Sequence, residues 1–133
     1  MSLIFKVDPN LTTEEIAELR HLVGWEGREK RITRIIGSTF MTAACFEQDR
    51  LIGFVDVLSD GVEDALIRSL IVHPDYQRRG IALRLLKMVI KRTKAEKIKT
   101  INVLFEPELE PLYRKAGFRI VNGGLIDNEA EGF

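Results

Sequence analysis

Six residues near the middle of the chain, Gln77 to Ala82, have the types and order of an anion-binding turn. A continuous apolar run precedes them and an amphipathic helical pattern follows, so the turn is expected between a buried strand and a helix N-terminus. The first N–H groups of a helix have no intrahelical acceptor, and the helix dipole adds partial positive charge there. Gly80 has no Cβ and lets a ligand approach the backbone closely. Arg78 and Arg79 add two formal charges, so the sequence predicts an anion site.

This turn resembles the Q/R-x-x-G-x-G/A signature of the GCN5-related N-acetyltransferases, the GNAT superfamily. The preceding LIVHP segment from Leu70 and the following LLKMVI segment from Leu85 are also similar to that family. So is the segment from Leu112 to Phe118, whose Tyr-x-x-x-Gly-Phe pattern lies at the expected distance. The resemblance covers roughly residues 39 to 121 and implies an acyl-CoA donor, usually acetyl-CoA.

The resemblance also implies how the donor binds. The CoA pyrophosphate is expected on backbone N–H groups of the turn and first helical turn, and the pantetheine arm is expected to pair with the preceding strand. A main-chain N–H between Leu70 and Val72 would stabilise the tetrahedral oxyanion, and such donors contribute about 3 kcal/mol each. The expected cofactor-binding residues are Leu70, Ile71, Val72, Gln77, Arg78, Arg79, Gly80, Ile81, Ala82 and Leu83.

Tyr113 is the general acid that the resemblance implies, because it lies four residues before the glycine of the Gly117-Phe118 pair. The unperturbed pKa of a tyrosine, about 10, is near that of a thiol. Transfer of its proton to departing CoA thiolate is therefore nearly thermoneutral, which suits general acid catalysis. The alternative is a tyrosine packed under the sheet edge with its hydroxyl satisfied.

The sequence does not assign a general base. Many GNAT enzymes place a glutamate on the strand that corresponds to residues 64–72 or to residues 100–105, and the matching positions here hold Leu66 and Ile101. Neither side chain can accept a proton. Glu106 could act through water or attract a cationic amine. Proton release to water without a base is a further alternative, and weaker candidates are Asp56, Glu63 and Asp64.

The acceptor site is expected to include the region between Gly24 and Gly37, which often helps to form it in GNAT proteins. By that resemblance Trp25 and Glu26 are candidate substrate contacts, with Glu106 as a third. The alternative is that Trp25 caps the core and Glu26 is solvated. The expected partner is a small-molecule or peptide amine. Acidic side chains near the expected mouth favour a positively charged one; they are Glu26, Glu29, Glu106, Glu108 and Glu110.

Periodicity and turn signals predict the elements that position these residues. A strand–helix–strand unit around the anion-binding turn requires a parallel pair of strands. We expect an α/β (α+β) fold, a mixed antiparallel and parallel sheet flanked by helices, as the resemblance also implies. The expected strands are 3–7, 39–47, 51–58, 64–72, 100–105 and 118–121, and the expected helices are 13–23, about 32–36, 80–96 and 109–116.

The C-terminus departs from the family pattern. GNAT proteins usually finish with a long hairpin, whereas residues after 124 offer only a short second strand at Leu125-Ile126. An edge strand or part of the acceptor pocket then needs completion, and a homodimer is one way to supply it.

Composition is typical of one soluble globular domain, residues 1–133. Apolar residues make up 45% of the chain and charged residues 30%, which suits a buried core. No apolar run approaches the roughly 20 residues that span a membrane, and no secretory segment begins the chain. The single cysteine, Cys45, has apolar neighbours and suits a reducing cytoplasm. His21 and His73 give no metal-ligand spacing, so no metal is expected.

Charge is distributed unevenly although its sum is zero. Residues 68–99 carry 10 Lys and Arg against 2 Asp and Glu. This excess is confined to the anion-binding turn and one helix, whereas a nucleic-acid-binding protein would extend it over a whole face. We therefore expect no nucleic-acid partner.

Two functions fit these observations. The first is an acetyl-CoA-dependent N-acetyltransferase that transfers an acetyl group to a primary amine of a small molecule or peptide, by direct attack on the thioester. The second is a non-catalytic acyl-CoA sensor of the same fold, which the absence of a carboxylate at Leu66 and Ile101 supports. An unrelated nucleotide binder is disfavoured, because the turn lacks both the G-x-x-x-x-G-K-[ST] and the G-x-G-x-x-G patterns.

Overall fold

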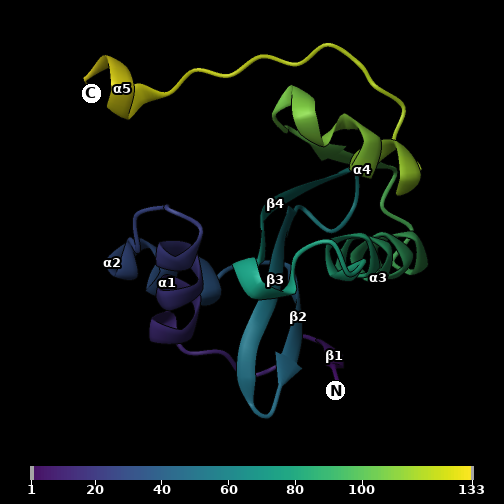
Figure 1. The fold of residues 1–133 in the computed structure, drawn as a ribbon. Helices are drawn as coiled ribbons and strands as arrows, with labels where there is room; N and C mark the ends of the chain where they lie inside the picture. The colour runs from purple at the N-terminus through teal and green to yellow at the C-terminus, as the bar shows by residue number, and fades with distance from the viewer. Residues whose placement is uncertain (1, 133) are drawn as a thin grey trace.

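A five-stranded mixed sheet forms the centre of the computed structural model, which describes residues 2–132 (Figure 1). The strands lie across the sheet in chain order, with β1 to β4 antiparallel and β5 parallel to β4. This confirms the expected α/β mixed sheet with one parallel pair. The strands are β1 (Ile4–Val7), β2 (Met41–Glu47), β3 (Arg50–Ser59), β4 (Asp64–Val72) and β5 (Thr100–Val103).

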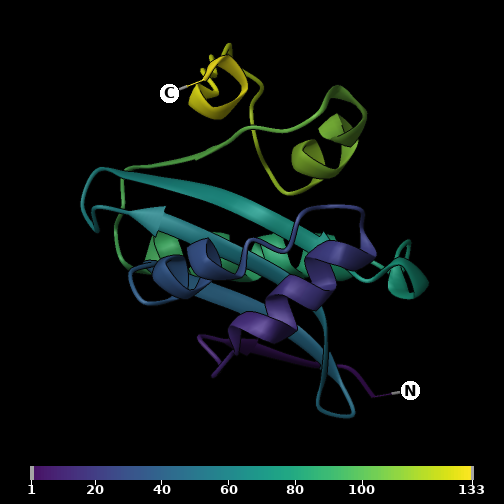
Figure 2. The same ribbon diagram turned by 90° about the vertical axis from the view of Figure 1, so that its left-hand side faces the viewer.

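Helices cover both faces of the sheet (Figures 1 and 2). On one face lie α1 (Thr13–Leu22) and α2 (Glu29–Ile36), and on the other lies α3 (Ile81–Ala95). The capping box that begins α1 is formed, because Thr12 and Glu15 each bind the other's backbone N–H. The remaining helical segments are η1 (Pro74–Tyr76), η2 (Pro107–Leu109), α4 (Glu110–Lys115) and α5 (Asn128–Glu131).

The core has two halves because side chains of a strand point alternately to the two faces. On β3, Val55 and Val57 belong to the half that includes Leu85 and Val89 of α3. Phe54 belongs to the half that includes Leu19 of α1. Burial on both faces explains why the central strands read as continuous apolar runs.

The prediction of a strand at Phe118–Val121 is wrong, and so is that of a short strand at Leu125-Ile126, because neither segment pairs with another strand. Residues 118–121 alternate between half-buried and exposed, as a strand would. A strand also needs a partner edge, and the adjacent β5 is only four residues long. The chain instead runs exposed from α4 to α5 above the sheet, with Leu125 80% accessible (Figure 1).

The last helix, α5, was not predicted. Asp127 caps it by accepting hydrogen bonds from the N–H groups of Glu129 and Ala130. An aspartate before a polar segment is an N-cap signal that the sequence contained. Within residues 2–132, no helix has the length and apolar character needed to cross a bilayer.

Candidate functional site

A bulge in β4 shapes the centre of the site. Phe54 of β3 pairs with Ile71 of β4, and Asp56 pairs with Arg68, so β4 has one residue more than β3 between these pairs. Ser69 lies in the bulge with φ 56°, a left-handed conformation that is uncommon for a non-glycine residue. The bulge shifts the alternation of β4 by one residue at this point.

The bulge coincides with the end of the parallel ladder. The last pair of β4 with β5 is Ile67 with Val103, although β4 itself continues to Val72. The two parallel strands therefore part at their C-terminal ends. The backbone of β4 from Arg68 onward therefore has no β5 partner, so an extended ligand can pair with it.

A pocket of about 620 Å³ lies beside this part of β4. It brings together the end of β4, the turn before α3, the first turn of α3, and the segment of η2 and α4. The residues that line it are Leu70, Val72, Tyr76, Gln77, Arg78, Gly80, Ile81, Ala82, Leu83, Glu108, Leu109, Pro111, Leu112, Tyr113 and Lys115.

The N-terminus of α3 opens into this pocket without a side-chain cap. The first backbone hydrogen bond of the helix runs from the Arg84 N–H to the Gly80 carbonyl, at 3.1 Å. The N–H groups of Ile81, Ala82 and Leu83 precede it, so they have no intrahelical acceptor. Gly80 has φ +81°, and no atom lies within 4 Å of the position that a Cβ would occupy. An anion can therefore approach these amides closely.

Backbone and side-chain hydrogen bonds hold the turn before α3 in place. The His73 N–H donates to the Ile52 carbonyl at 2.8 Å, and the buried His73 ring accepts from the Asp75 N–H at its Nδ1, at 3.0 Å. The Gln77 amide donates to the Val72 carbonyl at 3.1 Å. These bonds fix the turn to the ends of β3 and β4.

A second tether joins this turn to the β2–β3 hairpin. The Tyr76 hydroxyl donates to Glu47 Oε1, and Arg79 lies over the Tyr76 ring at 5.3 Å. The hydrogen bond that Tyr76 donates to Glu47, together with burial, raises the pKa of the Tyr76 phenol. The other carboxylate oxygen of Glu47 is buried and has no hydrogen-bond partner among residues 2–132. Sequence analysis missed Glu47, because it is 29 residues from Tyr76.

Tyr113 lies at the other wall of the pocket and is only 4% exposed. Its ring is stacked on Phe105, with centroids 4.4 Å apart, and meets the Phe118 ring edge-on at 5.8 Å. Burial raises the pKa of the Tyr113 phenol above its ordinary value of 10. The hydroxyl therefore keeps its proton at neutral pH, as a general acid must.

Most of the predicted cofactor-binding residues line the same pocket as Tyr113. Two of them do not. Ile71 is buried in the α1 half of the core, so only its backbone could serve a ligand. The Arg79 side chain lies over Tyr76. The roles predicted for all these residues stay predictions.

The predicted acceptor residues lie outside this pocket. Trp25 is 42% exposed and packs beneath Arg20, whose guanidinium is 5.2 Å from the ring centroid. Glu26 is exposed and pairs with Arg28 at 3.3 Å. Glu106 is exposed and precedes η2. Of the five acidic residues expected at the mouth, Glu108 lines the pocket.

None of the carboxylates proposed as weaker bases is free in the pocket. Asp56 is 2% exposed and pairs with Arg68 at 2.7 Å. Asp64 accepts from the Thr100 hydroxyl at the opposite end of β4, and Glu63 pairs with Lys99 at 3.5 Å. Among the described residues, no cluster of three His, Cys, Asp or Glu side chains is placed to hold a metal.

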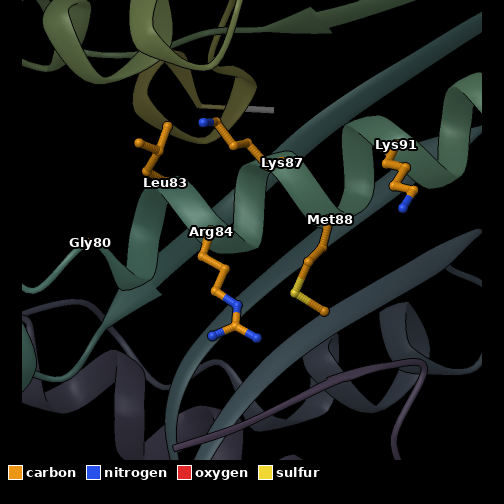
Figure 3. Close-up of a pocket in the computed structure, with 6 residues that line it drawn as sticks. All are labelled: Gly80, Leu83, Arg84, Lys87, Met88 and Lys91. Carbon is orange, nitrogen blue, oxygen red and sulfur yellow. The ribbon is translucent and has the colours of Figure 1, made fainter.

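A second hollow of about 310 Å³ continues from the pocket along α3 (Figure 3). Both hollows are lined by Gly80 and Leu83. Figure 3 shows Arg84 and Met88 on one side of the helix and Lys87 on the other. Arg84 lies 3.8 Å from the centroid of the Phe5 ring. The outer surface of α3 next to the pocket is therefore basic.

Comparison with known proteins gives the same fold. The acetyltransferase (GNAT) domain family matches residues 7–129. The N-acetyltransferase ycf52 of Gracilaria tenuistipitata is 34% identical over 109 residues, which are 78% of this chain and 60% of that protein. Its counterpart in Porphyra purpurea is 31% identical, over 82% of this chain and 66% of that protein. The chain thus spans about 60–66% of the length of these relatives.

Two solved structures illustrate the structural likeness. A GNAT-family acetyltransferase from Streptococcus pneumoniae superposes with a TM-score of 0.84 at 22% identity, covering 96% of this chain and 98% of that one. An aminoglycoside 6′-N-acetyltransferase in complex with coenzyme A gives 0.75 at 16% identity, covering 92% and 87%. At these identities the likeness shows the fold, and the family match extends over nearly the whole chain. The chain therefore belongs to the GNAT family of acetyltransferases.

Proposed function

We propose that the protein is an acetyl-CoA-dependent N-acetyltransferase that acts on a primary amine of a small molecule or peptide. One observation carries the proposal: a single pocket joins the uncapped N-terminus of α3, the unpaired part of β4 and the buried residue Tyr113. These are an anion site, a strand edge for an extended ligand, and a proton donor. The bound coenzyme A of the aminoglycoside acetyltransferase supports the same donor class.

Different groups of the protein bind the donor and stabilise the developing charge. The N–H groups of Ile81, Ala82 and Leu83 bind the pyrophosphate of the donor, because they are unpaired and lie at the positive end of the helix dipole. The backbone of β4 after Arg68 pairs with the pantetheine amides. The donor supplies an acetyl thioester, and an N–H between Leu70 and Val72 stabilises the negative charge that develops on its carbonyl oxygen during attack.

Tyr113 then protonates the departing thiolate. The surrounding Phe105 and Phe118 rings keep the phenol in an apolar setting, which favours its neutral, proton-carrying form. The amine loses its proton to water, since Leu66 and Ile101 cannot accept one and Asp56 is occupied by Arg68. Glu108 is the carboxylate that lines the pocket and can receive this proton through water.

The alternative of an acyl-CoA sensor is supported by the same observations, that Leu66 and Ile101 cannot accept a proton and that Asp56 is paired with Arg68. It differs from the enzyme in one measurable respect, which is whether thiol is released. The proposal is tested by mixing the protein with acetyl-CoA and a panel of primary amines, then following free CoA thiol and the mass of acetylated product. Thiol release that requires both amine and protein supports the enzyme. Binding of acetyl-CoA without turnover of any amine would favour the sensor.

A further inference from the structure

Asp56 and Arg68 form a charged pair that the proposed chemistry does not use. Asp56 is 2% exposed, and Arg68 Nε donates to its Oδ2 at 2.7 Å. The Thr39 hydroxyl donates to the other carboxylate oxygen. Desolvating such a pair costs free energy, so an ion pair of this kind is weak evidence for a stabilising role. What it does achieve is to hold the Arg68 guanidinium in one position.

The pair lies on the α1 and α2 face of the sheet. Asp56 is flanked on β3 by Val55 and Val57, which face α3, so its own side chain points the other way. Thr39 lies three residues after the end of α2, and its N–H donates to the Ile35 carbonyl of that helix, at 2.8 Å. The pocket proposed for the donor opens on the α3 and α4 face. The charged pair and the donor pocket are thus on opposite faces of β4.

The pair is also next to the reacting centre along β4. Arg68 directly follows the end of the β4–β5 ladder at Ile67 and directly precedes the bulge at Ser69. A strand rises about 3.3 Å per residue, so Arg68 and Leu70 are separated by roughly 7 Å. On this face, Phe54 and Ile71 are buried beneath α1, whereas the Arg68 side chain is 32% exposed and Leu58, two residues beyond Asp56, is 42% exposed. Arg68 is therefore where an acceptor could approach the thioester.

The Arg68 guanidinium has hydrogen-bond donors that its contact with Asp56 does not use. Arg68 contacts Asp56 through Nε, and its two terminal nitrogens have no hydrogen-bond or ion-pair partner among the described residues. The side chain is 32% exposed. A fixed guanidinium with both terminal nitrogens available matches the two oxygens of a carboxylate or phosphate.

The charges near this face agree with an anionic ligand. On this side of the sheet, the acidic side chain of Glu26 is engaged by Arg28 at 3.3 Å. Helix α2 carries three cationic side chains, Lys30, Arg31 and Arg34, of which Arg31 is paired with Glu129. The expectation of an acidic mouth is thereby weakened at Glu26.

We propose that Arg68 is a specificity-determining residue that binds an anionic group of the acceptor. The acceptor is then a small amine that also carries a carboxylate or a phosphate. Asp56 positions the guanidinium that binds this anionic group. This inference rests on the proposed N-acetyltransferase function and names the substrate class of its site.

The test is a calorimetric titration of the CoA-saturated protein with a product-like pair, N-acetylglycine and N-acetylglycinamide, which differ only in the carboxylate. O-phosphoethanolamine and ethanolamine form the matched pair for phosphate. Wild-type protein is expected to bind at least one anionic probe and to bind its neutral counterpart about 10-fold or more weakly. The pair with the larger difference tells carboxylate from phosphate.

Arg68→Lys is the decisive variant, because lysine keeps a positive charge near Asp56 but loses the planar fork. It should fold and should lose the preference for the anionic probe. Arg92→Lys is the matched control: Arg92 is an exposed residue near the far end of α3, paired with Glu96 at 3.9 Å. This control should behave as wild type. Equal affinity for anionic and neutral probes, or a preference that survives in Arg68→Lys, overturns the inference.

The donor is titrated first in the same experiment, which separates two kinds of failure. If CoA binds and neither anionic probe does, the acceptor inference is wrong while the proposed function stands. If CoA does not bind, the proposed function fails and this inference fails with it.

Discussion

Tyr113 and Phe105 are stacked, with ring centroids 4.4 Å apart and ring planes 14° from parallel. Phe105 follows β5, and Tyr113 lies on α4, so the contact ties the segment after the last strand to the helix that carries the proposed acid. The stacking fixes the ring, and burial keeps the phenol neutral. Position and protonation state of the hydroxyl thus have one common cause, which is the aromatic cluster around it.

Tyr113→Phe removes the proposed proton donor and keeps the stacked ring. We expect the turnover rate to fall about 100-fold or more, as for the loss of a general acid. The affinity for acetyl-CoA and the thermal unfolding temperature should stay near wild type. Steady-state thiol release, calorimetry and a melting curve check this. An unchanged rate would mean that Tyr113 has a packing role and that another group protonates the thiolate.

Gly80→Ala tests close approach to the α3 amides, and Gly61→Ala is its matched control. Both glycines have nearly the same left-handed backbone, φ +81° and φ +80°. Alanine should therefore destabilise each variant by a similar amount, about 1–2 kcal/mol. Only Gly80 lines the pocket, so only Gly80→Ala should weaken acetyl-CoA binding, by about 10-fold or more in calorimetry. A similar loss of affinity in both variants would point to strain rather than to blocked approach.

Glu47→Leu tests whether the hairpin tether positions the turn before α3. Leucine cannot accept the hydrogen bond from the Tyr76 hydroxyl, so the turn should lose order and the KM for acetyl-CoA should rise several-fold. The rate at saturating donor should change little, because Glu47 does not line the pocket. Glu47→Gln keeps an acceptor oxygen and should restore most of the affinity. If the glutamine and leucine variants behave alike, the hydrogen bond does not position the turn.

Cys45 is one source of the pH dependence of stability. This side chain is fully buried, and burial raises the pKa of its thiol from 9.0 to about 11. The folded state thus favours the neutral thiol. Its contribution to the free energy of unfolding is complete below pH 9.0 and is lost as the pH rises toward about 11.

Cys45→Ala removes this titration. Urea unfolding under reducing conditions, at a series of pH values, should show a smaller decline above pH 9.0 for the variant than for wild type. The expected difference is on the order of 2 kcal/mol. Both proteins retain Tyr113, so its own alkaline titration cancels in the comparison. Parallel declines would show that the thiol is not desolvated as its burial indicates.

The parts of the fold that depend on local pattern could be predicted from the sequence. The expected helices 13–23 and 80–96 formed as α1 and α3, because local signals set them: Thr12 and Glu15 cap α1, and Leu85 and Val89 lie on one apolar face of α3. The anion-binding turn was also readable, because Gly80 and the unpaired amides after it are consecutive in the chain.

Features that depend on distant partners could not be predicted. Residues 118–121 have a strand-like alternation, yet they pair with none of the five strands. The bulge at Ser69 shifts the pairing of β3 with β4, and no local signal marks such a shift. Asp56 and Arg68 meet because the register of the β3–β4 hairpin places them opposite each other, whereas the sequence alone suggested Asp56 as a base.

Calorimetric titration of the wild-type protein with acetyl-CoA, with ATP and pyrophosphate as controls, is the most direct test of the account. The account predicts saturable micromolar binding of acetyl-CoA that neither control reproduces, because the pocket offers a strand edge for pantetheine as well as amides for phosphate. Equal binding of ATP would reduce the site to a general anion site. No binding of acetyl-CoA up to millimolar concentration would contradict the proposed donor and the enzyme with it.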